Sequence, residues 1–187
     1  MVIQSLCDFT VIIESYVEGR WTARTASTII DQRNYVQHRL MSLPTKQELD
    51  DGGVMDVDPL YESCRLATIA YSFLVVFPLP PVIGPFEAVA AELRQELLTV
   101  HLEFQDSSTA QLVLWITVMG GIAALGLPER LWFRSRVNIL RAHLGVTSWP
   151  ELKAVLQQFL WHPSTNDPDG REFLEDELPD LGELQST

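Results

Sequence analysis

Three polar side chains at the start of an otherwise apolar helical segment are the first candidates for chemistry. Tyr61, Glu62 and Arg65 lie within four positions of one another, so a helix places their side chains close together. The simplest interpretation is that Glu62 and Arg65 form an ion pair that fixes packing register. The functional interpretation is that Arg65 or Tyr61 donates a hydrogen bond to a carbonyl group of a bound apolar molecule.

Large side chains elsewhere in the chain could wall a pocket for such a molecule. Trp115, Met119 and Trp132 are the candidates, because ligand pockets are mostly lined by apolar and aromatic groups. Aromatic residues at helical spacing are also the usual content of a protein core. Both interpretations stay open at the level of sequence.

Metal and cofactor sites are not indicated, and we expect neither. Gly52-Gly53 lacks the Lys-Ser/Thr of a phosphate-binding loop. A segment from Thr165 to Asp176 partly imitates a calcium loop but lacks its first carboxylate. Cys64 could act as a nucleophile only beside a histidine, and a buried structural thiol is the default. No metal-ligand spacing is found among the histidines, which are His38, His101, His143 and His162.

The glycine pair Gly120-Gly121 lies inside a strongly apolar segment. Each glycine in a helix costs about 1 kcal/mol relative to alanine, so the pair needs a compensating reason. Close packing of helices and room for a ligand are the two candidates, and close packing is the more common one.

Charge and cysteine content exclude several functions for the 187-residue chain. It carries 13 Lys and Arg against 25 Asp and Glu, a formal charge of −12 that repels nucleic-acid phosphates and anionic lipid. Two cysteines, Cys7 and Cys64, exclude a disulfide-rich secreted scaffold and fit an intracellular protein of the nucleus or cytoplasm. Residues 67–86 and 107–127 are long enough to span a bilayer, but four prolines in the first and many polar residues and glycines in the second argue against insertion.

Apolar residues recur at intervals of three and four through most of the chain, which predicts an all-α protein. Thr10 to Ile13 is the one β-branched run that could form a short strand, and residues 45–57 are acidic and glycine-containing, as in a solvated loop. Ser148 and Glu151 have the spacing of a helix capping box. We expect a single-domain bundle of about seven helices, over residues 2–17, 21–41, 58–77, 86–97, 110–125, 128–144 and 148–160.

The last 22 residues differ from the rest of the chain. Residues 166–187 contain eight acids and one base, Arg171, which is typical of a solvated, partly disordered terminus. We therefore divide the chain into a helical domain over residues 1–165 and an acidic tail over residues 166–187.

Several segments, in this order and spacing over about residues 28–175, resemble the fungal-specific transcription-factor domain, which is the helical regulatory region of fungal zinc-cluster transcription factors. The segments that carry the resemblance are residues 31–44, 60–67, 77–80, 114–124, 130–133, 148–149 and 159–161. The resemblance implies an all-helical effector domain, normally attached to a six-cysteine zinc module that reads DNA and to a coiled coil that dimerises it. Two cysteines cannot supply that module, so we expect either a stand-alone relative or a piece of a longer polypeptide, and the initiating Met1 favours the former.

Two functions are compatible with these observations. The first is a regulatory module without enzymatic activity that binds a protein partner or an apolar small molecule, does not contact nucleic acid or membrane, and leaves homodimer formation open. The second is a cofactor-independent cyclase of fungal secondary metabolism, a Diels-Alder-type pericyclase that folds an apolar polyunsaturated substrate in a helical pocket. Such catalysis needs mainly the correct placement of the reacting ends, so the absence of a catalytic triad does not exclude it. A closed pocket containing Tyr61 or Arg65 would favour the enzyme, and a filled core would favour the module.

Overall fold

The computed structural model describes residues 2–17, 19, 24–80, 84–100 and 106–175. Within these residues it contains α-helices and one π-helical turn, and no strand, so the prediction of an all-α protein is confirmed. Thr10 to Ile13 lie inside the first helix, and the alternative of a strand there was wrong. The helices are α1 (Val2–Val17), α2 (Arg24–Met41), α3 (Lys46–Asp51), α4 (Tyr61–Tyr71), α5 (Pro85–Leu98), α6 (Ser107–Ala123), α7 (Glu129–Leu144), α8 (Trp149–Leu156) and α9 (Pro163–Glu175), and the π-helical turn is η1 (Ser72–Val76).

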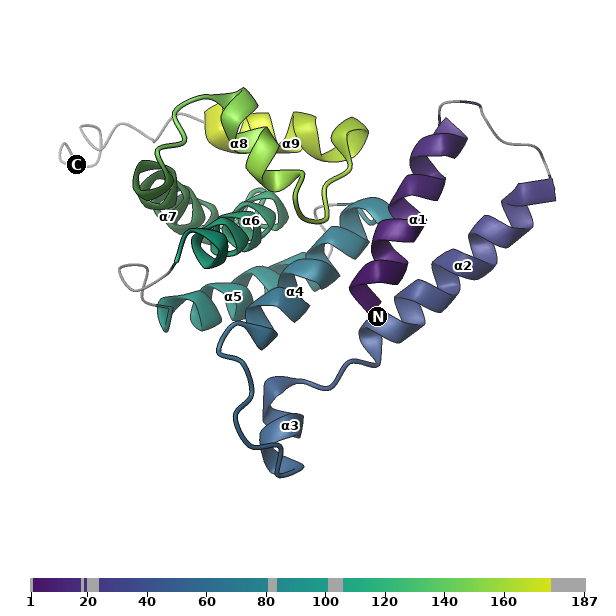
Figure 1. The fold of residues 1–187 in the computed structure, drawn as a ribbon, viewed down its shortest axis with the longest axis horizontal. Coiled ribbons are helices and arrows are strands. Elements are labelled where there is room, and N and C mark those ends of the chain that lie inside the picture. The colour runs from purple at the N-terminus through teal and green to yellow at the C-terminus, as the bar shows by residue number, and fades with distance from the viewer. Residues whose placement is uncertain (1, 18, 20–23, 81–83, 101–105, 176–187) are drawn as a thin grey trace, which may run out of the picture.

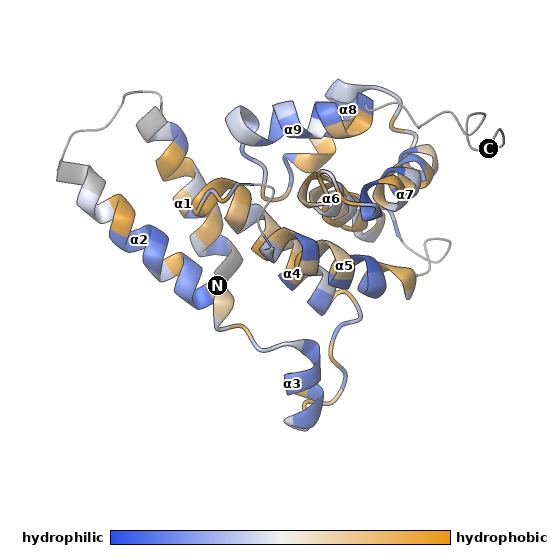
Figure 2. Ribbon diagram, turned by 180° about the vertical axis from the view of Figure 1, so that it is seen from behind, coloured by the Kyte–Doolittle hydropathy of each residue, from blue (hydrophilic) through white to orange (hydrophobic). Residues whose placement is uncertain are grey.

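Helix α6 forms the centre of the molecule. It packs against α4, α5, α7, α8 and α9, and Figures 1 and 2 show this apolar helix surrounded by the others. Its N-terminus is capped by Asp106, whose carboxylate accepts hydrogen bonds from the backbone N–H groups of Ser108 and Thr109 at 2.9 and 3.0 Å. Residues on all sides of α6 are buried, as a helix with no polar face requires.

The two glycines of α6 allow neighbouring helices to approach closely. A Cβ added to Gly120 would lie less than 3.0 Å from the ring of Phe133 on α7, and one added to Gly121 less than 3.0 Å from the ring of Phe173 on α9. Both rings are fully buried. Close packing is therefore the reason for the glycine pair, and the space beside it is filled by protein.

Helices α1 and α2 pack together along one edge of the molecule (Figure 1). Leu6 and Phe9 of α1 and Val36 and Leu40 of α2 are buried between these helices and the body. A buried hydrogen bond of 2.7 Å joins the Thr10 hydroxyl to the Tyr71 hydroxyl at the end of α4. Buried side chains of α1 and of α6 thus belong to one continuous hydrophobic core.

The start of α4 differs from the sequence-based expectation. Asp58 does not cap a helix that begins at Pro59; its carboxylate accepts from the backbone N–H of Leu60, and helical structure begins at Tyr61. At its other end α4 continues into the π-helical turn η1, after which the chain enters the proline-rich segment. The short Asx turn has therefore replaced the first helical turn that we predicted.

Residues 45–57 are not a simple loop, because they contain α3. Thr45 and Glu48 form a capping box: the Thr45 hydroxyl accepts from the Glu48 N–H at 3.1 Å, and the Glu48 carboxylate accepts from the Thr45 N–H at 2.7 Å. This reciprocal pair satisfies donors that a short acidic helix would otherwise leave open. Helix α3 has no buried residue and projects from the other helices (Figure 1).

Helical structure continues ten residues past the predicted boundary at residue 165. Residues 163–175 form α9, in which Asn166, Gly170 and Phe173 are buried, so the acidic composition marks the outer face of a packed helix. The Arg134 guanidinium donates two hydrogen bonds to the Phe173 carbonyl, at 3.1 and 2.7 Å, and thereby ties α9 to α7. Residues 165–175 of the calcium-loop pattern lie in this helix and do not form a loop, and Asp176 lies outside the described residues. Residues 176–187 of the predicted tail lie outside the described residues.

Within the described parts of the chain, none of the helices has the length and apolarity that a bilayer span requires.

Candidate binding groove

A hollow of about 740 Å³ lies beside α3, and we call it the arm groove. The arm is the segment of residues 42–60 that carries α3, and the opposite wall is formed by α5. Arg65 and Leu66 of α4 line the groove between them. The described lining residues are Thr45, Lys46, Gln47, Asp50, Glu62, Arg65, Leu66, Ala91, Glu92, Arg94, Gln95, Glu96 and Glu129.

Glu62 and Arg65 form a nearly buried ion pair in this groove. The Arg65 Nη2 donates to Glu62 Oε1 at 2.5 Å, Nε donates to both carboxylate oxygens at 3.1 and 3.0 Å, and each side chain is 10% exposed. Burial disfavours ionisation of Glu62, but the hydrogen bonds from Arg65 and from the Lys46 backbone N–H outweigh it and hold the pKa below its ordinary value. The hydrogen bond from Arg65 to Glu62 raises the pKa of Arg65. Both groups are charged at neutral pH, so the structural interpretation of this pair is supported.

The same carboxylate fixes the arm to α4. Glu62 Oε2 accepts the backbone N–H of Lys46, the first residue of α3, at 3.0 Å. The Tyr61 hydroxyl donates to the Pro44 carbonyl at 2.7 Å, and burial raises the pKa of this phenol. The hydroxyl group of Tyr61 therefore donates its hydrogen bond to the arm. The functional interpretation required this group to donate to the carbonyl of a ligand instead.

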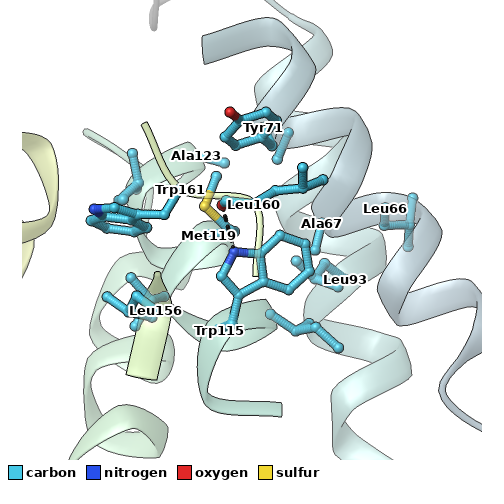
Figure 3. Close-up of a cluster of buried hydrophobic side chains, with 14 of the residues drawn as sticks. Leu66, Ala67, Tyr71, Leu93, Trp115, Met119, Ala123, Leu156, Leu160 and Trp161 are labelled. Atoms are coloured by element: carbon cyan, nitrogen blue, oxygen red, sulfur yellow. Dashed lines mark hydrogen bonds between the residues drawn. The ribbon is translucent and has the colours of Figure 1, made fainter. Parts of the chain in front are cut away.

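Trp115 and Met119 are part of the core and do not line the groove. The Trp115 Nε1 donates to the Leu160 carbonyl at 2.8 Å, and its indole stacks on Phe159 with ring centroids 5.8 Å apart. Met119 is fully buried, and Figure 3 shows its sulfur among the side chains of Tyr71, Trp115 and Trp161. The structure places these two predicted pocket residues in a filled core.

Trp132 is not among the described lining residues of the groove, but it contacts one of them. Its ring packs edge-to-face against Phe133 at a centroid distance of 5.1 Å, and the Arg94 guanidinium lies 5.8 Å from its centroid. Arg94 itself lines the groove. Of the five predicted site residues, the structure therefore brings Arg65 into the arm groove and places Trp132 next to it through Arg94.

Sequence reasoning missed most of the charged groups in the groove. Lys46 and Asp50 lie in the predicted loop over residues 45–57, and Glu92, Arg94 and Glu96 lie in the predicted helix over residues 86–97, with no site assigned to either segment. The capping-box spacing of Thr45 and Glu48 was a signal for α3 that the sequence did contain. Nothing in the sequence indicated that α3 lies opposite α5, because that placement depends on contacts between residues far apart in the chain.

The described side chains of the arm groove can recognise charged and hydrogen-bonding groups. Its described lining residues include neither cysteine nor histidine. Cys64 lies on α4 outside this set, and burial, with the nearby Asp58 charge, raises its pKa to about 11, so the reactive thiolate is scarce at neutral pH. Among the residues that the structure describes, no cluster of three or more His, Cys, Asp or Glu side chains could hold a metal ion.

The described fold thus defines an all-α protein with a charged groove between a projecting arm and its body. No family model matches the chain, and comparisons with curated proteins and with solved structures found no match.

Proposed function

We propose that this chain is a non-catalytic regulatory module, a stand-alone relative of the regulatory domain of fungal zinc-cluster transcription factors, and that it binds a protein partner in the arm groove. The observation that carries the proposal is the contrast between a filled core and an open, charged groove. Trp115 and Met119 are buried, whereas the described lining of the groove includes eight ionisable side chains. The resemblance to the fungal family contributes the regulatory role.

The cyclase alternative has less support. It required a closed apolar pocket that contains Tyr61 or Arg65, but Tyr61 is bonded to Pro44 and Arg65 is bonded to Glu62. Leu66 and Ala91 are the hydrophobic residues among the described lining of the groove. An apolar substrate or ligand would thus leave charged groups desolvated, which is costly.

The charges of the groove indicate the chemistry of the partner. After Glu62 and Arg65 neutralise each other, Lys46 and Arg94 face a larger set of carboxylates: Asp50, Glu92, Glu96 and Glu129. A chain of net charge −12 also attracts cationic partners over longer distances. The partner is therefore a protein segment rich in lysine and arginine.

The test is a fluorescence titration with a defined probe: a labelled ten-residue peptide of alternating lysine and serine. Glu92→Gln/Glu96→Gln removes two carboxylates from the groove. Exposed ion pairs contribute about 0.2–1 kcal/mol each, so we expect the Kd to rise by roughly two- to thirtyfold. Amide chemical shifts of Gln47, Asp50 and Gln95 should move on binding.

The matched control is Glu87→Gln/Asp31→Asn. It removes the same charge from exposed positions outside the described lining of the groove. Equal weakening by both double variants would show that the peptide responds only to net charge, and the assignment of the groove would then be wrong.

A further inference from the structure

The outer face of α7 has a second hollow, of about 420 Å³, which we call the α7 hollow. Its described lining comes from one helix and consists of Arg134, Ser135, Asn138, Ile139 and Ala142. Ile139 is 53% exposed, and Leu131, one turn before Ser135, is 44% exposed. These residues recur at intervals of three and four, so small and apolar side chains form a stripe along α7 that the described residues do not cover.

The helix that carries this stripe is basic. It contains four arginines and one acidic residue, Glu129, in a chain whose net charge is −12. Arg134 borders the hollow, and Arg141 lies one helical turn from Asn138 along the same side. Arg141 donates to the Val146 and Thr147 carbonyls, which are neutral acceptors, so its charge still contributes to the potential at this face. The chemistry of the hollow therefore suits an acidic segment with apolar side chains.

The chain contains such a segment directly after α9. Residues 176–187 include four acids and no base, and Leu178, Leu181 and Leu184 alternate with the acids. The hydrogen bonds from Arg134 to the Phe173 carbonyl place the end of α9 at the border of the α7 hollow. Twelve extended residues reach up to about 40 Å, whereas the helix from Arg134 to Ala142 is about 12 Å long.

We propose that residues 176–187 bind intramolecularly along the α7 hollow, with their leucines on the Ile139 stripe and their carboxylates near Arg134 and Arg141. The short tether supplies an effective concentration in the millimolar range, so weak contacts suffice. This proposal does not depend on the arm groove, and either can fail without the other.

Disulfide trapping in the 187-residue chain tests whether the tail binds in the α7 hollow. Ala142→Cys/Gly182→Cys places one thiol in the hollow and one in the tail, and it keeps every leucine, acid and arginine named above. In a glutathione redox buffer, with products identified by mass spectrometry, we expect this pair to form an intramolecular disulfide at least ten times faster than the control pair. Native Cys7 and Cys64 are retained, and the unsubstituted chain serves as the blank.

The control pair is Leu125→Cys/Gly182→Cys. Leu125 is 40% exposed and lines a small hollow together with Asp169 and Glu172, so it also lies near the helix that precedes the tail. Adding Ile139→Asp, or replacing Asp176, Glu177, Asp180 and Glu183 by amides, should slow trapping at position 142 at least threefold. Circular dichroism verifies that each variant is folded.

Equal trapping rates at positions 142 and 125 would overturn the proposal. Disulfides that form mainly between chains would do the same, because a second copy would then be the occupant. Trapping that is unaffected by the amide substitutions would contradict recognition by charge and would also overturn it.

Discussion

Phe173 occupies the space where a side chain at position 121 would project. Its ring is fully buried at the contact between α9 and α6, so it cannot retreat without moving α9. We expect Gly121→Ala to destabilise the protein by about 2 kcal/mol, because overpacking of about 3 kcal/mol exceeds the gain of about 1 kcal/mol in helix propensity. Urea unfolding measures this loss.

Gly84→Ala is the matched control, since an added Cβ there meets open space. Phe173→Leu in the Gly121→Ala background should recover part of the loss, because it removes the ring that the new methyl group contacts. If Gly121→Ala is as stable as the original chain, the approach of α9 to α6 is not as close as we describe.

At this scale the sequence identified the type of residue but not its neighbour. A pair of glycines in an apolar helix predicted close packing, and the structure confirms it. Nothing in the sequence indicated Phe173, because it is 52 positions away and lies in a segment whose acidic composition suggested a solvated tail. Tyr61 and Arg65 are also far from Trp115 in the sequence. No local pattern could have shown that Trp115 lies in the core and not beside them.

Capping boxes define the starts of two short helices. Ser148 and Glu151 form the predicted box at the start of α8, and hydrogen bonds from the Thr147 and Ser148 N–H groups lower the pKa of Glu151 from 4.5 to about 2. A carboxyl group with a lowered pKa stabilises the folded state above its unfolded pKa and loses that effect as the pH falls through its folded pKa. The stabilisation is therefore complete above about pH 5 and disappears between pH 4.5 and 2.

Thermal unfolding of Glu151→Gln across this range tests the box. We expect its Tm to lie below that of the original chain at pH 6 and the difference to shrink towards zero as the pH approaches 2. Glu92→Gln, in the middle of α5, is the control for removing one negative charge from a helix position that is not part of a capping box. A constant difference for Glu151→Gln would contradict a role for the ionised carboxylate.

Periodicity located the long helices well, since an amphipathic stripe is a local property of the chain. The two helices that it missed, α3 and α9, are polar, and composition alone assigned them to a loop and a tail. Helix α3 depends on its capping box and on Glu62, and α9 depends on three residues buried against the body. Both helices are stabilised by a few specific contacts. The average composition or periodicity of a stretch of sequence does not reveal such contacts.

The hydrogen bond from Trp115 to Leu160 joins the central helix to the segment after α8 (Figure 3). Trp115→Phe removes the donor and leaves a carbonyl without this partner in a buried position, which costs about 1–3 kcal/mol, and the smaller ring adds a cavity. We expect a loss of about 2–4 kcal/mol in the free energy of unfolding, measured by urea denaturation. Trp132→Phe, at a half-buried ring, should lose less; the opposite order would contradict the central role of Trp115.

The charge of the whole chain leads to a prediction about nucleic acid. At −12 it repels DNA phosphates, so we expect no saturable binding of a fluorescent 20-base-pair duplex at 50 mM salt in an anisotropy titration. The lysine-serine peptide serves as the positive control in the same buffer. Tight binding of the duplex that weakens steeply with added salt would contradict this prediction.

By itself, the sequence determined the helical class, the strongly apolar character of the segment that became α6, and the excess of negative charge. These properties depend on the order and composition of nearby residues, which the chain carries whether or not it is folded. The tertiary structure decided that Trp115 and Met119 fill the core, that Tyr61 and Glu62 hold the arm, and that the charges of α3 and α5 face one groove. Each of these outcomes depends on which distant side chains meet, and only the packing of the helices determines that.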